Sequence, residues 1–282
     1  MAVKIVTDSV ADLPPQIASD LGITVVPLTV SFGSEVYRDG VDLTADQFYK
    51  KLKDSRIFPT TSAPPPLAFA EVFDELAAET EEIIVLTISA KLSGTRDAAL
   101  QGTRLMKKRR RVEVIDSQLA TMAEGFIAMK AAQAARTGAS LDAVKAVIRK
   151  NIPRSQILAA FDTLEYLRRG GRIGAAKAYL GAMLNMNPLI TLKDGVVKPA
   201  GRTRSRSRAI DRLFAFIDSC SFVEELAVEY TVCREDAETL IERLAAIFPR
   251  QRIYRSKMTP VIGTHTGPGL LVVAVLGDRE KK

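Results

Sequence analysis

Residues 83–95 constrain the fold more than any other part of the chain. They begin with a short run of apolar and β-branched residues, from Ile83 to Ile88, which is typical of a buried strand. Small polar residues and Gly94 follow, and a helical pattern starts near Arg96. A strand, a polar loop and a helix in this order form the repeating unit of α/β proteins.

The same unit recurs at the start of the chain. Residues 3–9 read as a strand, residues 13–21 as a helix opened by two prolines and stopped by Gly22, and residues 23–28 as the next strand. A further strand is expected at residues 112–117. We therefore predict an α/β domain over residues 1–153, built in three layers on a mainly parallel sheet.

The pattern changes after residue 153, and a second α/β domain with a mixed sheet is predicted over residues 154–282. A hairpin is expected around Asp194-Gly195, which is a favoured turn pair. Amphipathic helices are expected near residues 208–220 and 234–248. Ligands of α/β sheets bind beyond the carboxyl ends of strands, so the loops that follow strands are the first places to search for a site.

Composition excludes several classes of protein. The chain has 282 residues, of which 47% are hydrophobic and 26% charged, as in a globular protein. It shows no apolar run of transmembrane length and no signal-peptide layout, and its two cysteines suggest no disulfide framework, so a cytoplasmic location is expected. A single histidine excludes a multi-histidine metal site within one chain.

The loop Ser93-Gly94-Thr95 is the first candidate binding element. The first N–H groups of a helix lack partners and carry partial positive charge, so an anion fits there beside the two hydroxyls. Gly94 allows close approach of the backbone. The alternative is an ordinary N-cap with a turn glycine, which taken alone is the more common arrangement.

Two other loops carry candidate residues. Residues 59–66 place three hydroxyls, at Thr60, Thr61 and Ser62, on a segment that four prolines should make a stiff loop. The only histidine, His265, follows Thr264 in a stretch with three glycines that predicts a shaped loop. Because a serine and a histidine can form a nucleophile and base, a Ser93/His265 acyl hydrolase or transferase is an alternative, although no orienting acid is identifiable.

Two basic runs, residues 107–111 and 202–208, contribute to a net charge of +7. Both runs can contact phosphates, which keeps nucleic-acid binding open as a hypothesis. However, aromatic residues make up only 6% of the chain and none lies within these runs, so no stacking platform is evident. No glycine-rich nucleotide motif occurs either, and a basic surface for an acidic protein partner is equally plausible.

Taken together and in order, these segments resemble the DegV family of bacterial fatty acid-binding proteins. The matching segments are Thr7-Asp8-Ser9, Thr60-Thr61-Ser62, Leu92-Ser93-Gly94-Thr95, Ile115-Asp116-Ser117, Leu164-Glu165-Tyr166-Leu167, Gly170-Gly171-Arg172-Ile173 and residues 263–269. They cover nearly the whole chain. The resemblance implies two α/β domains with a ligand in the cleft between them and no enzymatic activity of the chain's own.

The resemblance also implies roles for individual residues. The fatty acid carboxylate would be held by Thr61 and Ser93 with Ser62 and His265 close by, and Gly94, Thr95 and Thr264 would support these loops. The tail would enter an apolar tunnel lined by segments such as residues 175–186. The bound carboxylate would be presented to a separate fatty acid kinase, which makes the acyl-phosphate, and Arg172 and Arg202 would contribute to docking. No cofactor, metal, nucleic acid or membrane insertion is expected.

Overall fold

The computed structural model describes residues 2–182 and 186–279. The first half of the chain forms a four-stranded sheet with the order β2-β1-β6-β7, in which every neighbouring pair is parallel. Its strands are β1 (Lys4–Asp8), β2 (Ile23–Val26), β6 (Glu82–Thr87) and β7 (Arg111–Asp116). This sheet confirms the parallel architecture predicted from the βαβ pattern.

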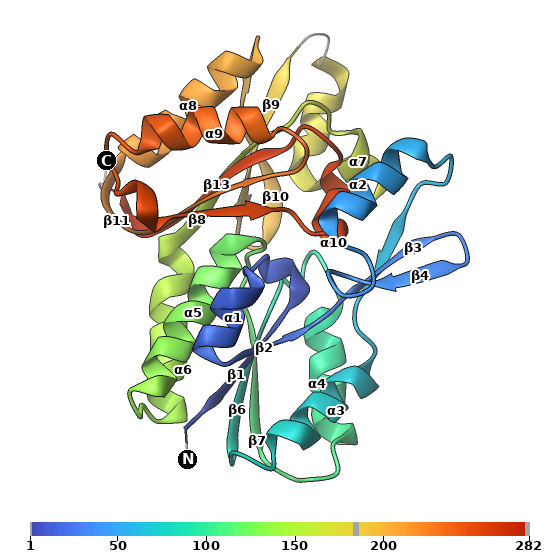
Figure 1. Cartoon of the computed structure of the whole chain (residues 1–282), viewed down its shortest axis with the longest axis vertical. Helices are drawn as coiled ribbons and strands as arrows, with labels where there is room; N and C mark the ends of the chain where they lie inside the picture. The colour runs from blue at the N-terminus through green and yellow to red at the C-terminus, as the bar shows by residue number, and fades with distance from the viewer. Residues whose placement is uncertain (1, 183–185, 280–282) are drawn as a thin grey trace.

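Helices cover both faces of this sheet and complete three layers (Figure 1). Alternate residues of β6 face opposite ways, so Ile84 and Leu86 pack on one side while Ile83 and Val85 pack on the other. The helices of the first side are α1 (Pro15–Leu21), α5 (Met122–Arg136) and α6 (Leu141–Asn151), and those of the second are α3 (Pro66–Leu76) and α4 (Thr95–Leu105). A short 3₁₀ turn, η1 (Ser9–Ala11), follows β1.

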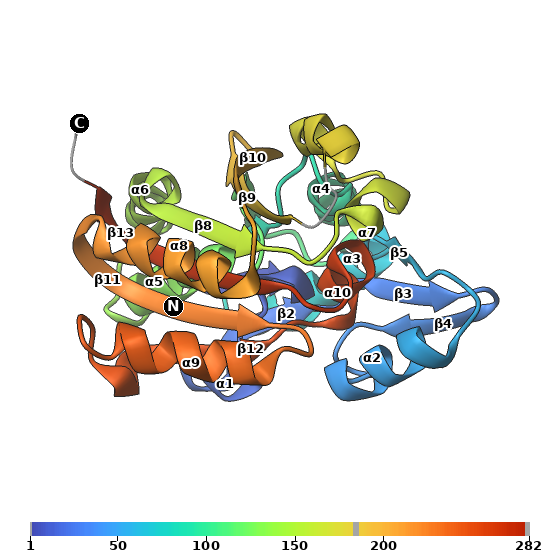
Figure 2. The ribbon, with the colours of Figure 1, turned by 90° about the horizontal axis from the view of Figure 1, so that it is seen from above.

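A small three-stranded sheet projects from this body beside α2 (Ala45–Asp54), as Figures 1 and 2 show. Its strands are β3 (Thr29–Phe32), β4 (Glu35–Arg38) and β5 (Thr60–Ser62). The expected stiff loop at residues 59–66 is therefore partly wrong, because Thr60–Ser62 pairs with β3 as a strand. Pro59 precedes this strand and the other three prolines follow it, so no ladder hydrogen bond is lost.

The second half of the chain forms a six-stranded mixed sheet in the order β10-β9-β8-β13-β11-β12. Its strands are β8 (Ser155–Ala160), β9 (Asn187–Lys193), β10 (Val196–Thr203), β11 (Cys220–Tyr230), β12 (Ile253–Lys257) and β13 (Leu271–Arg279). The predicted hairpin is confirmed: β9 and β10 are antiparallel, and Asp194 and Gly195 both have positive φ.

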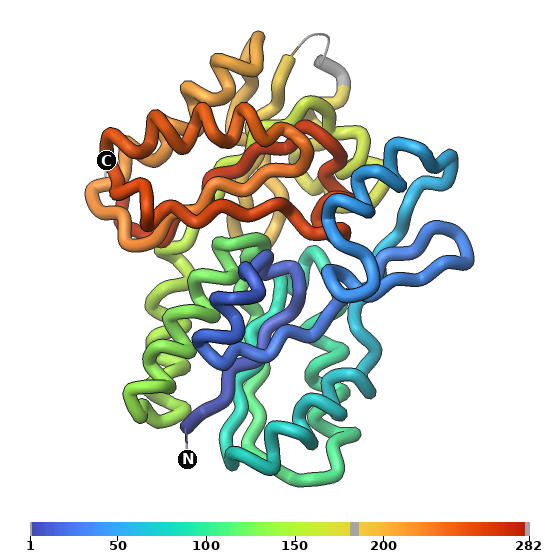
Figure 3. Tube along the Cα trace, viewed as in Figure 1, coloured from blue at the N-terminus to red at the C-terminus, as the bar shows by residue number. Residues whose placement is uncertain are grey.

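Two helices, α8 (Arg206–Asp218) and α9 (Arg234–Leu244), cover the outer face of this sheet. The remaining helical pieces are α7 (Glu165–Arg169), α10 (Pro260–Thr266) and the 3₁₀ segments η2 (Ile152–Arg154), η3 (Gly174–Ala182) and η4 (Arg250–Arg252). The predicted domain boundary between residues 153 and 154 falls within η2, where the chain passes from helix α6 to strand β8 of the mixed sheet (Figure 3). No helix in the described ranges is long and apolar enough to cross a membrane.

Helix α5 joins the two halves because it packs on both sheets. Its side chains contact Ile84 and Leu86 of the parallel sheet, and they share a core with Ile157 and Val272 of the mixed sheet. The cavity described below lies between the inner face of the mixed sheet and the loops that follow β6 and β7.

Buried carboxylates also link the two halves. Asp12 accepts a hydrogen bond from the N–H of Thr259 at 3.1 Å, and Asp39 accepts one from the N–H of Val261 at 3.1 Å. In a third link, the acceptor comes from the second half of the chain: Glu229 of β11 accepts a hydrogen bond from the N–H of Met122 at 3.0 Å. Burial raises the pKa of Asp39 to about 6 and that of Glu229 to about 7.

This arrangement predicts that stability falls as pH rises from 5 to 8. A carboxyl group whose folded pKa is raised binds its proton more tightly in the folded state, so its contribution is lost as pH rises through the folded pKa. For Asp39 the loss amounts to about 1–2 kcal/mol. Thermal unfolding of Asp39→Asn should show a smaller decrease between pH 5 and 8 than the unmodified protein. The exposed Glu71→Gln is the control, and an unchanged pH slope in Asp39→Asn would contradict the assignment.

Candidate functional site

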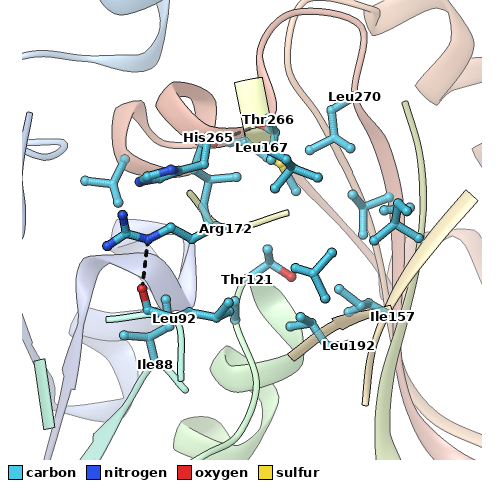
Figure 4. A pocket seen from close by; sticks show the side chains of 18 of the residues that line it. Ile88, Leu92, Thr121, Ile157, Leu167, Arg172, Leu192, His265, Thr266 and Leu270 are labelled. Carbon is cyan, nitrogen blue, oxygen red and sulfur yellow. Dashed lines mark hydrogen bonds between the residues drawn. The ribbon is translucent and has the colours of Figure 1, made fainter. Parts of the chain in front are cut away.

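A partly open cavity lies between the mixed sheet and the loops of the first half of the chain (Figure 4). Its volume is about 110 Å³, whereas one water molecule needs roughly 10–15 Å³ on the same measure, so it admits a chain of several atoms. It is lined by Leu28, Thr61, Ile88, Leu92, Ser93, Ala120, Thr121, Ile157, Ala159, Phe161, Leu167, Arg172, Ile190, Leu192, Val197, Met258, Val261, Ile262, His265, Thr266, Leu270 and Val272.

Most of this lining is apolar because the inner face of the mixed sheet supplies it. Along β8, Ile157 and Ala159 face the cavity while Leu158 and Ala160 pack in the outer core under α8 and α9. This alternation follows from the pleat of the strand. A cavity with such walls favours a hydrocarbon chain over a polar ligand.

Four polar residues, Thr61, Ser93, Arg172 and His265, form what we call the polar end of the cavity. Thr61 Oγ1 and His265 Nε2 lie 2.8 Å apart and are hydrogen-bonded, although the residues are 204 positions apart in sequence. Burial, and then the positive charge of Arg172, lowers the pKa of His265 to about 4. The imidazole is therefore neutral at pH 7.

His265 lies in the last turn of helix α10, so the predicted loop at this position is wrong. Pro260 fits the first turn of a helix because its missing N–H is not needed there. Gly267, with φ of +71°, then ends the helix. The signal was present in the sequence as a proline followed by six residues and a glycine, but the neighbouring glycines indicated a loop more strongly.

Ser93 precedes helix α4 and its hydroxyl lies 2.8 Å from that of Thr95. Gly94 occupies the N-cap position, and no side chain makes a capping hydrogen bond to the helix. The N-cap alternative therefore does not account for these hydroxyls. Ser93 faces the cavity beside a helix N-terminus that carries partial positive charge, as an anion site requires.

Arg172 lies in the cavity wall as well as near the surface. Its guanidinium donates to the carbonyl oxygen of Leu92 at 3.1 Å and to that of Gly170 at 2.7 Å, as Figure 4 shows for the first of these. Sequence reasoning gave Arg172 a docking role only and missed this placement. Gly170 is required beside it, because a Cβ there would lie 2.2 Å from His265 Nδ1.

The other predicted site residues lie outside the cavity lining. Ser62 is exposed, and buried Thr264 donates to the carbonyl oxygen of Pro260 at 2.9 Å within α10. Arg202 is exposed, with its guanidinium 5.2 Å from the ring centre of Tyr179. No described residue of the predicted tunnel segment 175–186 lines the cavity, and residues 183–185 of that segment lie outside the described residues.

The hydrolase alternative requires Ser93 to be paired with His265. In the structure His265 Nε2 is bonded to Thr61, and Ser93 to Thr95. Within the described ranges, His265 Nδ1 has no hydrogen-bond partner, so no carboxylate orients the ring. The geometry supports holding an oxygen-rich group at the polar end better than activating a nucleophile.

Known proteins are similar to this chain over nearly its whole length. The profile of a family described as "uncharacterised protein, DegV family" matches residues 2–278. The protein DegV of Bacillus subtilis is 32% identical over 279 residues, covering 96% of this chain and 98% of its own length. A DegV domain-containing protein of Streptomyces coelicolor is 38% identical over 277 residues, with 97% and 98% covered.

Solved structures with the same fold also cover nearly the whole chain. A DegV family protein of Thermus thermophilus, described by its fatty acid binding, has a TM-score of 0.90 at 34% identity and covers 98% of this chain and 100% of its own. DegV of Bacillus subtilis, described as a fatty acid binding protein, has a TM-score of 0.89 at 29% identity, with 99% and 100% covered. A stearic acid-binding protein of Eubacterium ventriosum has a TM-score of 0.87 at 26% identity, with 98% of each chain covered. On sequence and fold together, this chain belongs to the DegV family.

Proposed function

We propose that this protein binds a long-chain fatty acid, with its tail in the apolar cavity and its carboxylate at the polar end. The observation that carries the proposal is a partly open cavity with hydrocarbon walls and a cluster of hydroxyl, imidazole and guanidinium groups at one place in it. The fatty acids bound by the similar structures support the same ligand class. The tail contributes most of the affinity, at about 0.8 kcal/mol per buried CH₂.

At the polar end, the hydroxyls of Thr61 and Ser93 donate to the carboxylate. His265 is neutral at pH 7, so it serves as a hydrogen-bonding group that orients the Thr61 hydroxyl. Arg172 supplies the positive charge that a partly buried carboxylate requires, since an unpaired charge is costly to bury. Ser62, Gly94, Thr95 and Thr264 act as support for the loops and the helix that hold these groups.

We further propose that the protein is a cytoplasmic carrier rather than an enzyme, and that it presents the carboxylate to a separate fatty acid kinase in an acyl-phosphate route to phospholipid. The absence of a Ser93–His265 hydrogen bond supports binding over catalysis. Arg172 at the polar end is partly exposed and Arg202 is exposed, so both offer positive charge to a nucleotide-bearing partner.

Removing either hydroxyl should weaken fatty acid binding. In Thr61→Val and in Ser93→Ala a carboxylate oxygen loses a donor, so each change should cost about 1–3 kcal/mol of binding free energy. The measurement is titration calorimetry with oleate on delipidated protein, supported by native mass spectrometry of the purified protein. The exposed Thr239→Val on α9 is the control. Unchanged affinity in both cavity variants would refute the proposed carboxylate position.

Replacing Arg202 should impair presentation of the carboxylate to the fatty acid kinase without affecting fatty acid binding. Because the Arg202 side chain is exposed and absent from the cavity lining, Arg202→Ala should retain the fatty acid affinity of the unmodified protein. Acyl-phosphate formation by a bacterial fatty acid kinase should fall about tenfold or more. Arg109→Ala, an exposed arginine of the other basic run, should keep full turnover. Equal turnover in all three proteins would exclude Arg202 from docking.

A further inference from the structure

Thr121 is a polar residue in an otherwise apolar part of the cavity wall. It belongs to the cavity lining, and the residue is only 5% exposed. Among the described residues, its hydroxyl has no hydrogen-bond partner. By contrast, Thr61, Ser93 and Thr266, the other hydroxyl residues in the described lining, each make a hydrogen bond within the protein. Figure 4 shows the Thr121 oxygen among the lining side chains.

The backbone at Thr121 adopts a conformation that β-branched residues avoid. Its φ is +61° and its ψ is −161°, immediately before helix α5. Hydrogen bonds fix this conformation: the N–H of Thr121 donates to Val10 at 2.9 Å, and its carbonyl accepts from Glu124 at 2.9 Å and Gly125 at 3.1 Å. Glycine would adopt this conformation without strain, so a threonine here points to a use for its side chain.

Glu229 of β11 lies close to Thr121 but is not part of the cavity lining. One of its carboxyl oxygens accepts from the N–H of Met122, while the other has no partner among the described residues. Burial raises the pKa of Glu229, and the nearby Thr121 hydroxyl lowers it in part. The two groups are therefore close, but their geometry does not make a hydrogen bond. When the hydroxyl turns its proton toward Glu229, its lone pairs face the cavity and accept from a ligand.

We propose that Thr121 forms a subsite for a hydroxyl group on the acyl chain, so that the cavity takes hydroxylated fatty acids as well as unsubstituted ones. This inference rests on the proposed fatty acid binding and adds a substrate class to it. A ligand hydroxyl both donates and accepts, so it pairs with Thr121 whichever way the Thr121 proton points. A plain hydrocarbon chain leaves that buried oxygen without a partner on its cavity side.

The test compares stearic acid with a series of hydroxystearic acids in which the hydroxyl moves along the chain from carbon 3 to carbon 17. Affinities are measured by competition on the delipidated full-length protein and on Thr121→Val, which keeps the side-chain shape and β-branching. We expect one position, or two neighbouring positions, to lose about three- to tenfold in affinity in Thr121→Val. Stearic acid should bind Thr121→Val equally well or more tightly.

Thr121→Ser keeps the hydroxyl and should retain the positional preference, which separates hydrogen bonding from a change in packing. Melting temperatures of both variants show whether they fold. An equal ratio of hydroxystearate to stearate affinity in the unmodified protein and Thr121→Val, at every position, would overturn the inference and leave the hydroxyl serving Glu229 alone. If stearate itself fails to bind the unmodified protein, the proposed function fails instead.

Discussion

The structure depends on helix α5 being buried between two sheets. A helix with water on one side carries apolar residues on one face only. Helix α5 contacts both the parallel sheet and the mixed sheet, so it carries apolar residues on the faces toward both sheets. Its many alanines allow both sheets to approach closely, and Gly125 is needed because a Cβ there would lie 2.7 Å from the carbonyl oxygen of Ala11. This packing fixes the separation of the two sheets beside α5 and leaves the cavity where the helix begins.

The position of the cavity explains its two kinds of lining. The inner face of the mixed sheet continues beyond the start of α5, and there it faces the loops that follow β6 and β7 and helix α10. Strand residues such as Ile157 and Val272 supply hydrocarbon walls, while the loops and α10 supply hydroxyl and imidazole groups. A site at the carboxyl ends of parallel strands is the usual location in α/β proteins, where helix N-termini and loop donors meet. An amphipathic ligand matches both parts.

Several buried carboxyl groups lie in the same part of the structure, and few positively charged side chains pair with them. Burial raises the pKa of Asp8 to about 7 and of Asp39 to about 6, and it also raises the pKa of Asp12 and Glu124. Two of these groups, Asp12 and Asp39, accept backbone N–H bonds from the second half of the chain, so they hold the two halves together. Thr121 and Glu229 lie at the junction of this group with the cavity.

The sequence by itself determined the family, the α/β class, the parallel sheet and the hairpin at Asp194-Gly195, because strand runs, helix breakers and turn pairs are local signals. It also identified Thr61, Ser93 and His265, which the fold brings to one cavity. It did not show that Thr60–Ser62 is a strand, because the pairing partner β3 lies about thirty residues away, nor that His265 ends a helix. Only the tertiary structure placed Arg172 in the cavity wall, excluded the described part of residues 175–186 from it and left the Thr121 hydroxyl unpaired. These features arise from contacts between segments distant in sequence, and whether a side chain faces a cavity or solvent depends on what packs against it.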